Sequence, residues 1–194
     1  MIELDDAYWS NRYHTNTATW DAGIITTPLK EYIDQLTDKN IAILVPGCGN
    51  SYEAEYLLQQ GFNNITLIDI SSLLCRAVEE KLKPFFSSGL KIICGDFFEL
   101  QGQYDLIIEQ TFFCALDPSL RKAYAEKMYQ LLKPGGKLVG VLFNRSFEGG
   151  PPFGGNENEY RELFQPQFKI QIMEPCYNSI GPRKNAELFI KLAK

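Results

Sequence analysis

The stretch Val45–Tyr52, with the sequence VPGCGNSY, decides the fold because it joins a strand-like run to the start of a helix. The continuous apolar run Ile41–Val45 precedes it, and a helical pattern over Tyr52–Gln60 follows it. Gly47 and Gly49 allow the backbone to turn tightly and to approach a ligand with no Cβ in the way. The unpaired N–H groups at the start of the helix face the same ligand. The stretch therefore predicts a binding turn at the carboxyl end of a buried strand.

Further apolar runs follow along the chain and alternate with helical patterns. The runs are continuous, as expected for strands that are covered on both faces of a sheet. They cover Ile65–Ile68, Leu90–Cys94, Tyr104–Ile108 and Lys137–Phe143. The helical patterns cover Ser71–Lys83 and Pro118–Leu132, and the turn 133–136 (KPGG) ends the second of them. This alternation predicts βαβ units and a parallel sheet with right-handed crossovers.

The last quarter of the chain has a different pattern. A loop rich in glycine and proline over Asn144–Asn158 leads into a helical pattern over Glu157–Phe164. Two strand-like runs, Phe168–Met173 and Glu187–Leu192, then follow with no long helix between them, which predicts an antiparallel hairpin. The expected fold is α/β, with a doubly wound, mostly parallel, seven-stranded Rossmann-like sheet that ends in a C-terminal antiparallel hairpin.

Residues 1–40 contain no strand signal but carry several aromatic side chains, among them Trp9 and Trp20. We expect this segment to form a helical or irregular N-terminal lid, so that the α/β core spans residues 41–194. The chain has 194 residues and no repeat or linker composition, which predicts a single domain over residues 1–194.

The composition argues against several classes of partner and site. Charged residues make up 22 % of the chain and the net charge is −5, so we expect no nucleic-acid partner. No basic amphipathic stretch indicates a membrane partner. The five cysteines form no CxxC pair and His14 is the only histidine, so no metal is expected. Dispersed cysteines and an acidic N-terminus without a signal peptide indicate a cytoplasmic protein. The sequence does not determine the oligomeric state, and a monomer is plausible.

Acidic residues at two strand ends narrow the identity of the ligand. Asp69 ends the second strand, 20 residues after Gly49, where a carboxylate can accept hydrogen bonds from both ribose hydroxyls of an adenosine. Asp96 and Phe97 follow the third strand and could border the adenine. A nicotinamide dehydrogenase would require a third glycine where Tyr52 stands, for close approach to a pyrophosphate. S-adenosylmethionine has no pyrophosphate, so the turn favours this methyl donor.

With these motifs the chain resembles the thiopurine S-methyltransferase superfamily and, within it, the plant-type halide and thiol methyltransferases. The resemblance covers nearly the whole length. It rests on Trp9, Thr19–Gly23, Pro46–Gly49, Asp69–Ser71, Gly95–Phe98, Tyr104–Ile107, Glu109–Pro118, Arg121 and Gly149–Phe153. Generic methyltransferases share the glycines and the acid expected to bind the ribose. They do not share the motif at Thr19–Gly23 or the segment TFFCA over residues 111–115.

The resemblance implies a set of site residues. Positions expected to contact S-adenosylmethionine are Trp9, Trp20, Gly47, Cys48, Gly49, Asp69, Ile70, Asp96, Phe97 and Glu109. Thr111 is expected beside the methyl group together with Glu109, and Phe112 is expected in an aromatic acceptor pocket. Arg183, which precedes the last strand, is a candidate guide for an anionic acceptor, although a solvated loop arginine remains an alternative.

The chemistry of methyl transfer narrows the acceptor. Displacement at a sulfonium requires a collinear nucleophile and the exclusion of water. A soft anion is already nucleophilic and needs no strong base, which is compatible with the single histidine, His14. We therefore predict an enzyme that methylates a small soft nucleophile (a thiol, bisulfide or halide) and releases S-adenosylhomocysteine.

Other readings remain open from the sequence. The same donor could serve an aromatic or heterocyclic thiol, a metalloid or an oxygen acceptor. The chain could also bind S-adenosylmethionine without catalysis, and nicotinamide binding would revive the dehydrogenase reading.

Overall fold

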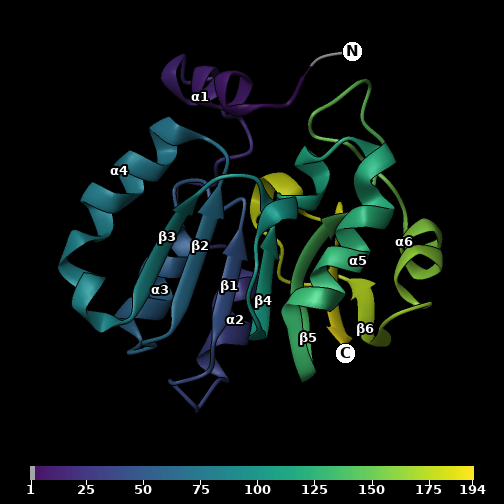
Figure 1. Ribbon diagram of the computed structural model, residues 1–194. Helices are drawn as coiled ribbons and strands as arrows, with labels where there is room; N and C mark the ends of the chain where they lie inside the picture. The colour runs from purple at the N-terminus through teal and green to yellow at the C-terminus, as the bar shows by residue number, and fades with distance from the viewer. Residues whose placement is uncertain (1–2) are drawn as a thin grey trace.

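The computed structural model describes residues 3–194, and within them seven strands form one twisted sheet in the order β3-β2-β1-β4-β5-β7-β6 (Figure 1). Strands β1 to β5 run parallel to one another, whereas β7 is antiparallel to both β5 and β6. The bounds are β1 Ile43–Pro46, β2 Ile65–Asp69, β3 Leu90–Cys94, β4 Tyr104–Gln110, β5 Leu132–Phe143, β6 Lys169–Pro175 and β7 Glu187–Ala193. The predicted fold class, including the C-terminal antiparallel strands, is confirmed.

Helices cover both faces of this sheet. One face packs against α2 (Thr27–Asp34), α3 (Tyr52–Gln59) and α4 (Ser72–Leu82), and the other against α5 (Arg121–Leu131) and α6 (Glu157–Phe164). Short 3-10 helices connect the elements: η1 Lys83–Ser88, η2 Phe97–Glu99, η3 Phe113–Ala115, η4 Pro118–Leu120 and η5 Gly181–Arg183. Each face buries its own apolar cluster, which explains why the strands are continuously apolar.

Two boundaries differ from the sequence-based expectation near α5. The helix expected over Pro118–Leu132 is divided into η4 and α5, although Asp117 caps η4 by accepting a hydrogen bond from the Ser119 N–H at 2.9 Å. The glycine turn expected at residues 133–136 lies inside β5. The pairing of β4 with β5 shifts register there, so that the turn residues bulge out of the ladder and the strand continues.

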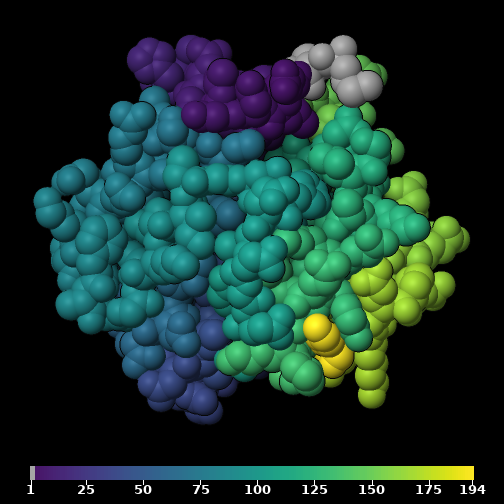
Figure 2. All heavy atoms as spheres, in the orientation of Figure 1, coloured from purple at the N-terminus to yellow at the C-terminus, as the bar shows by residue number. Residues whose placement is uncertain are grey.

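The N-terminal segment divides into two parts with different roles. In α1 (Asp6–His14), the Asp6 carboxylate accepts a hydrogen bond from the Ser72 N–H at 2.8 Å, and the Ser10 and Ser71 hydroxyls lie 2.8 Å apart. These contacts hold α1 across the carboxyl ends of the strands, at the top of the molecule (Figures 1 and 2). In α2, by contrast, Leu29 and Ile33 are fully buried in the core. The lid is therefore shorter than the expected residues 1–40.

Between residues 3 and 194 every helix lacks the length or the apolar character needed to cross a membrane.

Candidate functional site

A cavity of about 510 Å³ lies at the carboxyl ends of β1, β2 and β4. The strand order changes direction between β1 and β4, and ligands of open α/β sheets bind at such switch points. The volume falls within the range of roughly 300–1,000 Å³ that is usual for small-molecule sites. All site residues predicted from the sequence line the cavity except Glu109: Trp9, Trp20, Gly47, Cys48, Gly49, Asp69, Ile70, Asp96, Phe97, Thr111, Phe112 and Arg183.

The glycine turn forms the floor of the cavity. Gly47 has a φ of +55°, and a Cβ at this position would lie 2.3 Å from Cδ2 of Phe112. A side chain is therefore excluded both by the left-handed backbone and by the aromatic ring. The turn joins β1 to α3 beside the cavity, as the sequence of Val45–Tyr52 predicts.

Asp69 ends β2 beside the turn. Its Oδ2 accepts a hydrogen bond from the Gly49 N–H at 3.0 Å, and its Oδ1 accepts one from the Ser71 N–H at 2.9 Å. Each carboxylate oxygen keeps acceptor capacity toward the cavity, which fits the two hydroxyls of a ribose. Burial raises the pKa of the carboxyl, and the backbone N–H groups oppose this shift.

The two residues expected to border the adenine, at the end of β3, are an exposed acid and a buried aromatic residue. Asp96 accepts a hydrogen bond from the Phe98 N–H at 2.8 Å and thereby caps η2. Phe97 is 5 % exposed and its ring centroid lies 5.0 Å from that of Phe112. Phe97 therefore belongs mainly to the core and presents only part of its ring to the cavity.

Aromatic side chains of the N-terminal segment also line the cavity. The rings of Trp9 and Trp20 meet edge to face with centroids 5.5 Å apart. Trp20 donates a hydrogen bond from Nε1 to the Tyr13 hydroxyl at 3.1 Å, and Tyr13 also lines the cavity. Tyr13 was not among the predicted site residues. Its spacing of four residues from Trp9 on α1 is the signal that identifies it, because such residues share a helix face.

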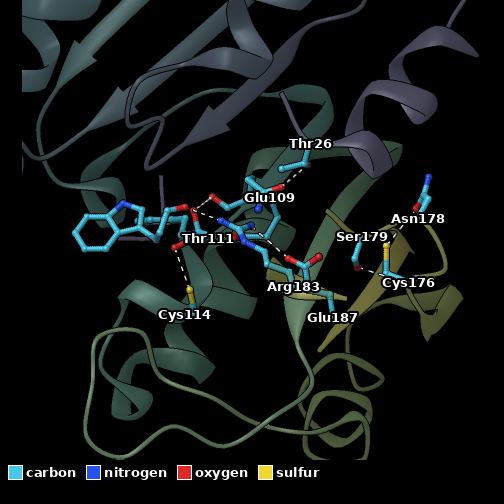
Figure 3. Close-up of polar contacts among 12 residues, drawn as sticks. Thr26, Glu109, Thr111, Cys114, Cys176, Asn178, Ser179, Arg183 and Glu187 are labelled. Atoms are coloured by element: carbon cyan, nitrogen blue, oxygen red, sulfur yellow. Dashed lines mark hydrogen bonds and ion pairs between the residues drawn. The ribbon is translucent and has the colours of Figure 1, made fainter. Parts of the chain in front are cut away.

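Arg183 of η5 is only 7 % exposed, so it is not a solvated loop residue. Its Nη2 donates a hydrogen bond to the main-chain carbonyl of Trp20 at 2.6 Å, and its Nη1 lies 3.3 Å from Oε1 of Glu187 (Figure 3). The guanidinium therefore connects the last strand to the lid while it lines the cavity.

The structure places Glu109 behind the cavity wall and not on it. The side chain is fully buried, and its Oε1 accepts hydrogen bonds from the N–H groups of Phe112 and Phe113 at 2.8 and 2.9 Å. Its Oε2 accepts one from the Tyr124 hydroxyl at 2.6 Å. Burial raises the pKa of Glu109 to about 7, and these donors oppose the shift. Because neighbours on a strand face opposite sides, Gln110 lines the cavity instead.

Burial or position argues against a nucleophilic or basic role for three groups near the site. Cys48 and Cys114 are buried, and burial raises the pKa of both thiols, which disfavours the thiolate. His14 is exposed at the end of α1 and does not line the cavity. Nor do any three or more His, Cys, Asp or Glu side chains within residues 3–194 form a group that could hold a metal ion.

Five acids that were not predicted as site residues also line the cavity: Glu3, Asp5, Asp21, Glu53 and Asp117. Asp21, in the lid, accepts a hydrogen bond from the Gly23 N–H at 2.7 Å and contacts the Asn50 amide and the Tyr52 hydroxyl. Glu53, in the first turn of α3, is 6 % exposed. An acid in the first turn of a helix is common for electrostatic reasons alone, so the sequence gives no signal for Glu53.

Comparison with known proteins agrees with this geometry. The profile of the thiopurine S-methyltransferase family matches residues 4–190. A probable thiol methyltransferase 2 of Arabidopsis thaliana is 32 % identical over 96 % of this chain and 84 % of its own length. A thiocyanate methyltransferase 1 of Brassica oleracea is 28 % identical over 95 % and 83 %. A thiopurine S-methyltransferase of Acinetobacter baylyi is 26 % identical over 88 % of each chain.

Solved structures share the fold at low sequence identity. A 1,6-didemethyltoxoflavin-N1-methyltransferase of Burkholderia thailandensis, with bound S-adenosylhomocysteine, superposes with a TM-score of 0.79 at 17 % identity, over 97 % of this chain and 86 % of that chain. The resemblance inferred from the motifs is thus confirmed. The chain is an S-adenosylmethionine-dependent methyltransferase that belongs to the thiopurine S-methyltransferase family.

Proposed function

We propose that this methyltransferase transfers the methyl group to a small soft nucleophile: a thiol, bisulfide or a halide ion. The observation that carries the proposal is the lining of the cavity, to which Trp9, Trp20 and Phe112 contribute aromatic rings and in which Arg183 is the one cation among the described residues. A weakly hydrated anion loses less on leaving water for a largely apolar site than a strongly hydrated anion does. The plant relatives, a probable thiol methyltransferase and a thiocyanate methyltransferase, support the same class of acceptor.

The proposed roles of the remaining site residues follow from their positions. We infer that Asp69 and Ile70 hold the ribose, that Asp96 and Phe97 border the adenine, and that the backbone of Gly47–Gly49 faces the donor. When bound, S-adenosylmethionine supplies a methyl group on a positively charged sulfur. We infer that the chain orients this group and excludes water with the aromatic side chains of Trp9, Tyr13 and Trp20, which line the cavity.

Thr111 and Phe112 are proposed to shape the reaction end of the cavity. Thr111 has a φ of +61°, and its hydroxyl donates a hydrogen bond to the Gln110 carbonyl at 2.7 Å. Glu109 acts through this turn, because it fixes the N–H groups of Phe112 and Phe113 from behind. Arg183, the one cation among the described lining residues, is proposed to guide an anionic acceptor while it also pairs with Glu187.

The proposal is tested by measuring S-adenosylhomocysteine formation with bisulfide, iodide and a small aromatic thiol as separate acceptors. We expect turnover with at least one of them and a ranking that identifies the preferred acceptor size. An Asp69→Ala variant should lose donor affinity, whereas Asp105→Ala, which removes an acid at the opposite ends of the strands, should not. Donor binding without turnover on all three acceptors would contradict the proposed acceptor class.

We also propose that residues 1–194 act as one domain in the reducing cytoplasm. The sheet draws strands from Ile43 to Ala193, and α2 packs into the same core. The five cysteines are free, which fits a compartment that keeps thiols reduced.

A further inference from the structure

The cavity is strongly acidic for a site that is proposed to admit an anion. The acids among its described lining residues are Glu3, Asp5, Asp21, Glu53, Asp69, Asp96 and Asp117, and Arg183 is the one cation. The methyl donor carries a sulfonium, an ammonium and a carboxylate, and so has a net positive charge. An excess of carboxylates therefore complements the donor and not the acceptor.

Glu53 differs from the other buried acids because, within residues 3–194, only its own backbone N–H donates to its carboxylate. It is 6 % exposed, yet no other residue within 3–194 donates a hydrogen bond to it. Glu109 accepts hydrogen bonds from two backbone N–H groups and the Tyr124 hydroxyl, and Glu187 accepts one from Arg183. A buried carboxylate that receives hydrogen bonds from no other residue is unfavourable unless another molecule supplies donors.

The nearby cations are already engaged. Arg183 donates to the Trp20 carbonyl and to Glu187. Lys81 pairs with Glu55 at 2.6 Å and donates to the Asn50 carbonyl. Burial raises the pKa of Glu53 to about 7, whereas Arg183 and Lys81 lower it only in part. A ligand that brings its own positively charged donor would complete this environment.

The position of Glu53 indicates which ligand this is. Glu53 is the second residue of α3, directly after the glycine turn, and the turn and helix start of this fold face the donor. An anionic acceptor would be repelled by a carboxylate at the same place. Gln110 lies in the wall of the same cavity with its Nε2 unpartnered, so a hydrogen-bond donor for a carboxylate is also present.

We propose that Glu53 binds the ammonium group of the amino-acid moiety of S-adenosylmethionine and thereby determines much of the affinity for the donor. This inference rests on the family's use of the donor and is independent of which acceptor the enzyme methylates. Glu53 is in this view a binding residue of the donor site, distinct from Asp69 at the ribose.

The test compares two ligands in the Glu53→Gln variant. S-adenosylhomocysteine contains the amino-acid moiety, whereas 5′-deoxy-5′-methylthioadenosine has the same nucleoside and thioether without it. Dissociation constants are measured by calorimetry, so no acceptor is needed. We expect the variant to bind S-adenosylhomocysteine about tenfold or more weakly, as for loss of a charge-assisted hydrogen bond, and methylthioadenosine within about twofold of the wild type.

Glu55→Gln is the matched control, since it removes the same charge from the same helix at a partly exposed position paired with Lys81. It should leave both affinities within about twofold of the wild type. Equal losses for the two ligands in Glu53→Gln would assign a structural role to Glu53 and overturn the proposal. Unchanged affinity for both ligands would overturn it as well. Absence of turnover on soft anions would instead contradict only the proposed acceptor.

Discussion

The guanidinium of Arg183 donates a hydrogen bond to the main-chain carbonyl of Trp20 at 2.6 Å and so joins positions 163 residues apart in the chain. The same side chain pairs with Glu187 at 3.3 Å, where both groups are almost completely buried. The lid is therefore anchored on one side to α4, through Asp6 and Ser72, and on the other to the segment before β7.

Replacement of Arg183 by methionine should destabilise the protein by about 3 kcal/mol, because it leaves the Glu187 carboxylate buried without its partner. The double variant Arg183→Met/Glu187→Gln should be more stable than Arg183→Met alone, since the unpaired charge is gone. Urea unfolding followed by circular dichroism measures both. If the double variant is no more stable than Arg183→Met, the loss of stability does not come from leaving the Glu187 carboxylate unpaired.

Gly47→Ala should reduce affinity for S-adenosylhomocysteine and destabilise the fold by about 1–3 kcal/mol, because the new Cβ overlaps the ring of Phe112. Gly135→Ala is the control. It has a similar left-handed φ of +78° with open space around the Cβ position, so it introduces backbone strain without overlap. We expect Gly135→Ala to leave ligand affinity unchanged. Equal effects on affinity would contradict a role for the contact with Phe112.

Glu109→Ala should lower kcat and destabilise the protein, because it removes the acceptor of the Phe112 and Phe113 N–H groups and of the Tyr124 hydroxyl. Glu109→Gln should retain much of the activity, since its amide oxygen can still accept from the two N–H groups and its NH₂ can donate to the tyrosine oxygen. The ratio of kcat values of the two variants measures this difference. Equal kcat values for Glu109→Ala and Glu109→Gln would show that the chain at Phe112 and Phe113 does not depend on a hydrogen-bond acceptor at position 109.

The parts of the site that could be predicted from the sequence are those with strict backbone requirements. Gly47 and Gly49 mark the turn because side chains are disfavoured there, and Asp69 follows from its place at the end of the next strand. The sheet could be predicted because its strands are covered on both faces and are therefore continuously apolar.

The parts that could not be predicted depend on side-chain direction and on distant packing. Glu109 and Gln110 are neighbours at the end of β4, and the sequence does not determine which one faces the cavity. Glu53 lies close enough to Arg183, 130 residues further along the chain, for that cation to lower its pKa, and no local pattern at the start of α3 predicts this neighbour. Leu29 and Ile33 belong to the core because α2 packs against one face of the sheet. Their segment contains no strand signal, so the sequence predicts a lid there.

The carboxyl of Glu53 should make stability depend on pH in a defined direction. Burial raises its pKa from 4.5 to about 7, so the folded protein retains a proton that the unfolded chain releases between these values. The stabilising contribution of the protonated group is complete below about pH 4.5 and is lost as pH rises through about 7. Glutamine does not ionise and does not lose this contribution.

Glu53→Gln should therefore have nearly wild-type stability at pH 5 and should exceed the wild type by up to about 3 kcal/mol at pH 8. Urea unfolding of both proteins across this range measures the difference, with Glu55→Gln as a control that should not change with pH in this way. A constant difference between pH 5 and pH 8 would show that Glu53 ionises at its ordinary pKa. A gain at pH 8 together with weaker binding of S-adenosylhomocysteine would mean that an acid which disfavours folding is kept because it binds the donor.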